Sequence, residues 1–118
     1  MASLIDRVVA HYDARKNHSI TVPEWAEAGG PPVVIHYRSP TLATLSKVRK
    51  DADGDEFKMA AALVAICSLD EKGERLFKPM NWLDIFEKAD PQVVQRISAA
   101  IMATVDFSQQ AVEAAEKN

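Results

Sequence analysis

The sequence contains a single cysteine, Cys67, so an internal disulfide is excluded. Cys67 lies in an apolar run, where a thiol behaves as a small buried hydrophobe and not as a nucleophile. Neither sign of charge dominates: there are 14 basic and 17 acidic residues, giving a formal net charge of −3. Without a basic stripe the chain lacks what phosphate backbones attract, so we expect no nucleic-acid partner.

Long apolar runs are also absent. The apolar segment from Met59 to Cys67 is bounded by Lys58 and Asp70, far short of the roughly 20 residues that cross a bilayer. The N-terminal residues show no basic leader followed by an apolar core, so no secretory signal is expected. We therefore expect a cytoplasmic protein with no membrane partner.

Motifs for catalysis are missing as well. No serine lies in a nucleophile-elbow motif, and Gly29-Gly30 is followed by two prolines, which lack the N–H groups that a phosphate cradle uses. His11, His18 and His36 do not have the spacing of zinc ligands. We expect no enzyme activity and no cofactor.

The acidic segment from Asp51 to Glu56 invites comparison with a calcium-binding loop. Asp51, Asp53 and Asp55 fall at the first, third and fifth positions, but the sixth is Glu56 and the twelfth is Ala62. An EF-hand needs glycine and a bidentate carboxylate at those two places. We interpret the segment as a solvated loop between helices, and a metal-dependent enzyme is the least favoured alternative.

What the sequence does contain is helical periodicity. The wholly apolar segment from Met59 to Cys67 predicts a central helix that is covered on all sides. Five helices are expected: from about Ser3 to Lys16, from Ser39-Pro40 to near Lys50, from about Asp55 to Ser68, one that begins at Asn81 and one that begins at Asp90-Pro91. The last helix has an apolar stripe at Val93, Val94, Ile97, Ile101 and Val105.

Two short strands are expected on either side of a breaker cluster. They span Ser19 to Val22 and Val33 to Ile35, with Ala28-Gly29-Gly30-Pro31-Pro32 between them. An isolated hairpin is marginal in water, so it must lie against the helices. The predicted fold class is α+β, predominantly α-helical, with a short N-terminal antiparallel β-hairpin packed on a bundle of about five helices.

The chain of 118 residues has the length of one domain. We predict a single domain over 1–118, with a weakly ordered tail from about Ser108 to Asn118 because that segment is polar.

The order of these features carries a family resemblance. A strand ends at Val22-Pro23-Glu24-Trp25, a second runs from Val34 to Arg38, a segment from Leu63 to Phe77 contains the turn Asp70-Glu71-Lys72-Gly73-Glu74, and the chain ends in Glu116-Lys117-Asn118. From about Ile20 onward this order resembles the small tail assembly chaperones of long-tailed, siphovirus-type phages and prophages.

The resemblance implies a function. Such a chaperone binds the long, helical tape measure protein, keeps it soluble and promotes polymerisation of the tail tube around it. A longer form arising by ribosomal frameshifting would contact the tail tube protein. The resemblance places the protein in the host cytoplasm during assembly and implies its absence from the mature virion.

The alternative function is a structural virion component, such as a head-tail connector or minor tail protein. For partner binding we expect exposed apolar residues of the terminal helices, chiefly Leu4, Val8, Ile97 and Ile101. The same stripes would serve an intramolecular core or a homo-oligomer, so the sequence leaves open which stripe is the partner surface.

Overall fold

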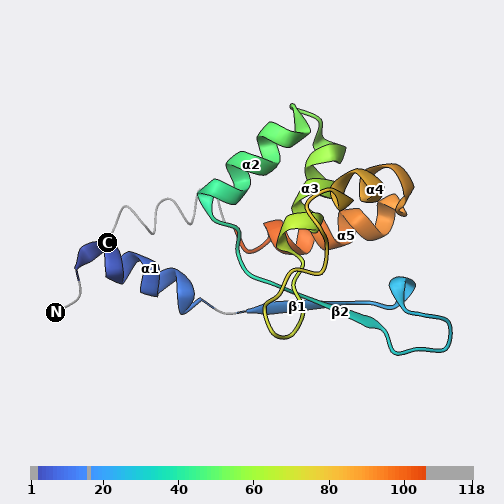
Figure 1. Cartoon of the computed structure of the whole chain (residues 1–118), viewed down its shortest axis with the longest axis horizontal. Helices are drawn as coiled ribbons and strands as arrows, with labels where there is room; N and C mark the ends of the chain where they lie inside the picture. Colours follow the sequence, from blue (N-terminus) through green and yellow to red (C-terminus); the bar gives the residue numbers. More distant parts are fainter. Residues whose placement is uncertain (1–2, 16, 106–118) are drawn as a thin grey trace.

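The computed structural model describes residues 3–15 and 17–105 (Figure 1). The elements follow one another as α1 (Leu4–Asp13), β1 (His18–Val22), the 3₁₀ turn η1 (Pro23–Trp25), β2 (Val33–Tyr37), α2 (Leu42–Ala52), α3 (Glu56–Cys67), α4 (Asn81–Lys88) and α5 (Pro91–Met102). This confirms the predicted fold class, a mainly helical α+β fold with an N-terminal antiparallel hairpin. The predicted tail from Ser108 to Asn118 lies outside the described residues.

The central helix α3 is the hub of the fold. Asp55 caps it, since one carboxylate oxygen accepts hydrogen bonds from the backbone N–H groups of Phe57 at 2.8 Å and Lys58 at 3.1 Å. Helices α2, α4 and α5 all pack on it. Its small side chains, among them Ala61 and Ala65, are buried and allow this close approach. The predicted central helix from Asp55 to Ser68 is confirmed.

Helix α5 begins as the sequence predicts and ends earlier. Asp90 caps its N-terminus and Pro91 occupies the first turn. The helix ends at Met102, so Val105 does not continue its stripe. The reason is a change to tighter turns, in which the N–H of Thr104 donates to the carbonyl of Ile101 and that of Val105 to Met102.

The hairpin pairs Ile20 with Ile35 and Val22 with Val33 in antiparallel register. Residues of its inner face, including Val22 and Ile35, are fully buried, as expected for strands that need a helical layer to cover them. Trp25 makes an edge-on contact with Phe77.

The predicted reversal after α3 extends the hairpin. Leu69 exchanges two backbone hydrogen bonds with His36 of β2, at 2.8 and 2.9 Å. Asp70 then accepts from the N–H groups of Lys72 and Glu74, and Gly73 takes the positive φ of 85° that glycine adopts without strain. The turn therefore holds the end of α3 against the sheet.

Two further helix boundaries differ from prediction. Helix α2 is capped by Thr41 and not by Ser39-Pro40, because Ser39 is buried and occupied elsewhere: its carbonyl accepts from the Tyr12 hydroxyl and its own hydroxyl donates to the carbonyl of Thr104. Helix α1 is capped by Ser3 as predicted but ends at Asp13. The predicted end at Lys16 lies outside the described residues.

Helix α1 stands apart from the other four helices described. Figure 1 shows it beyond the end of the hairpin, away from the group formed by α2 to α5. Among the described residues, the contacts that hold α1 are at its C-terminal end: the Arg38 guanidinium donates to the Tyr12 carbonyl at 2.8 Å and lies 4.7 Å from the centre of the Tyr12 ring. The apolar residues Leu4, Ile5, Val8 and Val9 of α1 are exposed.

Candidate functional site

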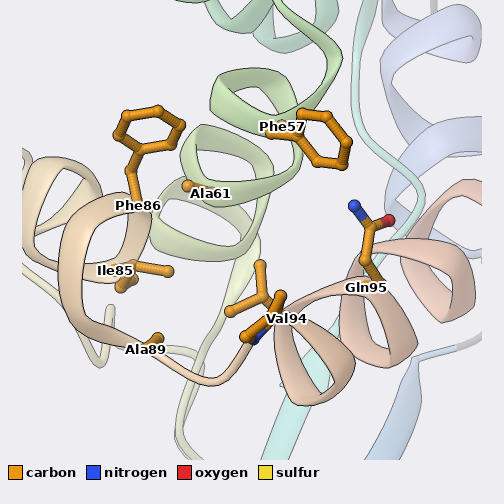
Figure 2. A pocket seen from close by; sticks show the side chains of 8 residues that line it. Phe57, Ala61, Ile85, Phe86, Ala89, Val94 and Gln95 are labelled. Atoms are coloured by element: carbon orange, nitrogen blue, oxygen red, sulfur yellow. The ribbon is translucent and has the colours of Figure 1, made fainter.

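A hollow of about 260 Å³ opens where α3, α4 and α5 meet (Figure 2). Figure 2 shows Phe57 and Phe86 on either side of Ala61, with Ile85 and Val94 beneath them. Its lining is almost wholly apolar and consists of Phe57, Ala61, Ile85, Phe86, Ala89, Pro91, Val94 and Gln95.

A second hollow of about 160 Å³ continues along α3 and α5. It shares Phe57 and Gln95 with the first, and its other walls include Leu63 and Met102. We call the two hollows together the Phe57 groove. Two mainly apolar hollows that share the side chains of Phe57 and Gln95 have the form of a surface that receives apolar side chains from a helix.

Phe57 is the side chain that distinguishes this groove. It is 65% exposed, although most residues of α3 are buried. Burying a phenylalanine side chain stabilises a protein by roughly 1.5–3 kcal/mol, so an exposed one beside an apolar hollow makes the groove a candidate binding surface. Lys58 lies 5.6 Å from the centre of the Phe86 ring and adds a positive charge to the rim.

The second apolar surface is the face of α1. Leu4, Ile5, Val8 and Val9 are 68%, 65%, 55% and 52% exposed, and no residue of α1 is buried. Two of the four predicted binding residues, Leu4 and Val8, therefore lie on an accessible surface. Their role in binding a partner stays a prediction.

Ile97 and Ile101 lie elsewhere. Both are fully buried in the core, where α5 packs on α3. The expectation that they lie on an exposed face is corrected, because the stripe at helical spacing is used within the fold. The accessible surface of α5 includes Gln95, which the stripe does not contain.

The Phe57 groove was not predicted from the sequence. Phe57 falls in the first turn of a helix interpreted as covered on all sides, and its exposure depends on how α4 and α5 approach α3. The available signal was a large aromatic residue two positions after the capping residue Asp55, ahead of a run of small alanines.

The acidic loop supports the helices around it. Asp51 pairs with Lys47 at 3.3 Å, Asp53 ends α2 in the left-handed conformation, and Asp55 caps α3. Within residues 3–15 and 17–105, no group of three or more histidine, cysteine, aspartate or glutamate side chains is placed to hold a metal ion. Burial raises the pKa of the Cys67 thiol to about 11, which keeps it protonated and unreactive at neutral pH.

In the same described part of the chain, no helix has the length and apolar character needed to cross a membrane.

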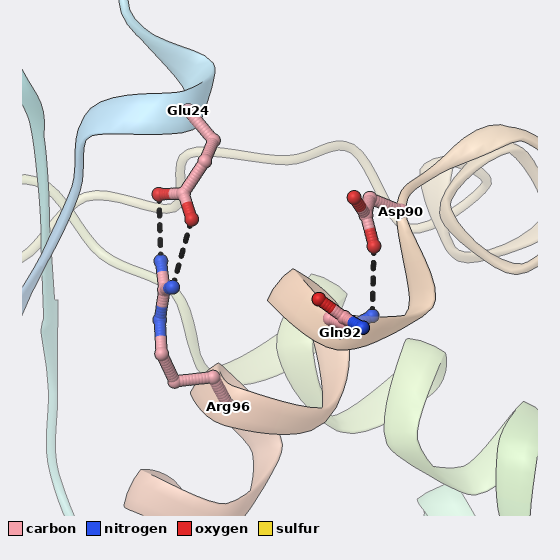
Figure 3. A network of polar contacts seen from close by, with 4 residues as sticks. All are labelled: Glu24, Asp90, Gln92 and Arg96. Atoms are coloured by element: carbon pink, nitrogen blue, oxygen red, sulfur yellow. Dashed lines mark hydrogen bonds and ion pairs between the residues drawn. The ribbon is translucent and has the colours of Figure 1, made fainter.

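The shortest ion pair joins the hairpin to α5. Arg96 donates two hydrogen bonds to Glu24, at 2.7 and 2.8 Å (Figure 3). The two side chains come from η1 and from α5, so the pair connects residues far apart in sequence. Because the Arg96 guanidinium donates to both carboxylate oxygens of Glu24, the pair fixes the relative orientation of the two side chains.

This pair predicts a pH-dependent contribution to stability. The hydrogen bonds from Arg96 lower the pKa of Glu24 from 4.5 to about 2. A carboxylate whose pKa is lower in the folded state than in the unfolded state stabilises the fold at pH values above its unfolded-state pKa. This stabilisation is lost as the pH falls toward the folded-state pKa. We expect Glu24→Gln to lower the free energy of unfolding at pH 7 and the difference to shrink between about pH 4.5 and 2. Urea unfolding at pH 7, 5 and 3 measures it.

Salt provides the control for this prediction. The two side chains are 44% and 42% exposed, so added salt should reduce the difference at pH 7. A difference between Glu24→Gln and the parent protein that stays constant over this pH range would show that the ion pair does not contribute.

Comparison with known proteins identifies the fold. No protein-family model matches the chain, and no curated protein matches it in sequence. Among solved structures, that of the bacteriophage HK97 tail assembly chaperone matches with a TM-score of 0.58 and 16% sequence identity, over 88% of this chain and 99% of that one. The resemblance predicted from the order of sequence features is confirmed at the level of the fold: the chain has the fold of a phage tail assembly chaperone.

Proposed function

We propose that this protein is a tail assembly chaperone of a long-tailed phage or prophage. The observation that carries the proposal is the shared fold, which extends over 88% of this chain and 99% of the HK97 protein. The order of motifs from Ile20 onward supports the same role independently of the coordinates. The role requires protein partners and no catalytic group.

We further propose that the partner is the tape measure protein. A long helical protein that awaits its tube exposes apolar stripes, which must be covered to prevent aggregation. The Phe57 groove supports this choice because it offers two apolar hollows on one helical face. One apolar side chain would enter each hollow, as in helix-in-groove recognition.

The chaperone would act in the host cytoplasm while the tail tube polymerises and would be absent from the finished particle. A longer, frameshifted form would bring in the tail tube protein.

Co-expression tests the proposal. We expect fragments of the tape measure protein from the same genome to be more soluble with this chain than without it, and to elute with it in size-exclusion chromatography at micromolar concentration. Failure to form any such complex would contradict tape measure binding. Mass spectrometry of purified virions separates the alternative, since a head-tail connector or minor tail protein would be present in the particle.

A further inference from the structure

The Phe57 groove follows one face of α5. Pro91 and Val94 line the first hollow, and Ser98 and Met102 line the second. Because these residues follow one another at spacings of three or four, they lie on the same side of the helix. The groove therefore runs along α5, and the positions of its hollows can be expressed in residues of that helix.

The two hollows are spaced for side chains seven positions apart on a bound helix. Pro91 and Ser98 are seven residues apart and Val94 and Met102 are eight, so at about 1.5 Å per residue the hollows lie roughly 11 Å apart along α5. In a bound helix, side chains seven positions apart share a face and are about 10.5 Å apart. Side chains four or eleven positions apart, at about 6 Å or 16 Å, would miss one hollow.

A partition separates the hollows. Phe57 and Gln95 line both hollows, and Figure 2 shows them on the side of the first hollow opposite Phe86. Phe57 is 65% exposed, whereas the floors are buried and include Ala61 in the first hollow and Leu63 in the second. A helix that spans both hollows must pass over the Phe57 ring midway between its two anchors. Small side chains at those midway positions would let the anchors reach the floors.

Charges at the two ends of the groove differ in sign. The Lys58 ammonium lies 5.6 Å from the centre of the Phe86 ring, at the first hollow, and Glu56 lines the second. Within the described part of the chain, neither side chain takes part in an ion pair. A partner carboxylate would therefore be attracted to the first hollow and repelled from the second.

We propose that the Phe57 groove selects helices with two large aliphatic residues seven positions apart, small residues midway between them and a carboxylate beside the anchor in the first hollow. The inference rests on the proposed function, since it takes the tape measure protein as the partner, and it specifies which helical segments of that protein are bound. Segments whose apolar residues have another spacing are not recognised by this groove.

Helix α1 of a second copy is the less favoured occupant. Its apolar residues seven positions apart are Ile5 and Tyr12. Val8 and Val9 lie midway between them, where large side chains would meet the Phe57 ring. The Tyr12 hydroxyl also donates to the carbonyl of Ser39 at 2.6 Å, which holds this side chain within its own chain.

Designed peptides test the spacing. The probe is a fluorescein-labelled, alanine-rich peptide of about 20 residues, a length at which an isolated helix forms in water. It carries leucines seven positions apart, alanines between them and a glutamate beside one leucine. The matched control has the same composition with the leucines five positions apart, on opposite sides of the helix. In anisotropy titrations with the full chain, we expect the control to bind about tenfold more weakly.

A change at the midway position tests the partition. Replacing the central alanine of the peptide by phenylalanine should weaken binding to the parent protein about tenfold, because the two aromatic rings would occupy the same space. In Phe57→Ala, which removes the ring from the partition, the same peptide change should weaken binding by less than about twofold. An equal loss in both proteins would show that no partition selects small residues.

Lys58→Glu tests the charge. Replacing the peptide glutamate by lysine should weaken binding to the parent protein about threefold at low salt and less at high salt, since the pair is at the rim. In Lys58→Glu the preference should be reversed. A glutamate is also compatible with the first turn of α3, where negative charge favours the helix dipole, so the variant is expected to fold.

The remaining outcomes separate this inference from the proposed function. If the chain binds tape measure fragments but does not distinguish the two leucine spacings, or binds none of the peptides, the inference is wrong and the proposed function stands. If it distinguishes the peptides but binds no tape measure fragment, the proposed function is wrong. If the protein self-associates and binds the peptide only after Leu4→Ser dissociates it, α1 of a second copy occupies the groove and the inference is wrong.

Discussion

Replacing Phe57 by serine is expected to weaken the affinity for a tape measure fragment by about 30-fold, or about 2 kcal/mol, while the protein remains folded. Phe57 stands between the two hollows of the Phe57 groove, so its ring would contact the apolar side chains that enter both. Aromatic residues at the centre of an interface contribute most of its binding free energy. Fluorescence anisotropy of a labelled fragment, titrated with each variant, measures the change.

Stability should change little in this variant. The Phe57 side chain is 65% exposed, and its contribution to the cap of α3 comes from its backbone N–H, which serine retains. We expect the free energy of unfolding to fall by less than about 1 kcal/mol, since exposed positions rarely contribute more. The loss of affinity would then belong to the groove and not to unfolding.

Leu42→Ser is the matched control. Leu42 is 81% exposed at the start of α2 and lines neither hollow, so it tests whether any exposed apolar residue matters. Affinity should be unchanged. Equal losses for Phe57→Ser and Leu42→Ser would indicate non-specific apolar association, and no loss in either would place the partner surface outside the groove.

Much of the fold follows from the sequence because local signals agree with the packing. Asp55 and Asp90-Pro91 start α3 and α5 as predicted, since capping and proline geometry are decided within one turn. Gly73 takes a positive φ in the turn after α3, a conformation that glycine adopts without strain. These local features can be predicted without knowing which residues distant in sequence contact them.

The structure differs from the sequence-based predictions where contacts between residues distant in sequence determine the conformation. Ser39-Pro40 has the local signature of a helix start, yet contacts with Tyr12 and Thr104 hold Ser39 and move the cap to Thr41. A period of three and four residues shows that a helix has an apolar face but not which neighbour covers it. Periodicity therefore could not predict that the apolar stripe of α1 is exposed while the equally regular stripe of α5 is buried.

The Phe57 groove, the proposed binding surface, was the least predictable part of the structure. Periodicity selects residues that share a face, and the exposed residue Phe57 lies in a helix whose other residues are mostly buried. A groove depends on the spacing between three helices, which only the assembled fold provides. The order of the motifs could indicate the fold without locating the groove.

Ile97→Ala is expected to destabilise the protein by about 2–5 kcal/mol, the range for removing a large aliphatic side chain from a core. Ile97 is fully buried where α5 packs on α3, and the cavity left by alanine can close only if the helices move. Domains of this size have total stabilities of about 5–15 kcal/mol, so the loss is a large fraction of the whole. Urea unfolding monitored by circular dichroism measures it.

A control variant and the binding assay together show whether Ile97 stabilises the core or contacts the partner. Leu42→Ala removes a comparable side chain from an exposed position and should change stability by less than about 0.5 kcal/mol. If Ile97 belongs to the core, the folded fraction of Ile97→Ala binds the tape measure fragment with unchanged affinity, the reverse of Phe57→Ser. Lost affinity with full stability would instead mean that α5 moves away from α3 to bind, and that the α5 stripe is a partner surface after all.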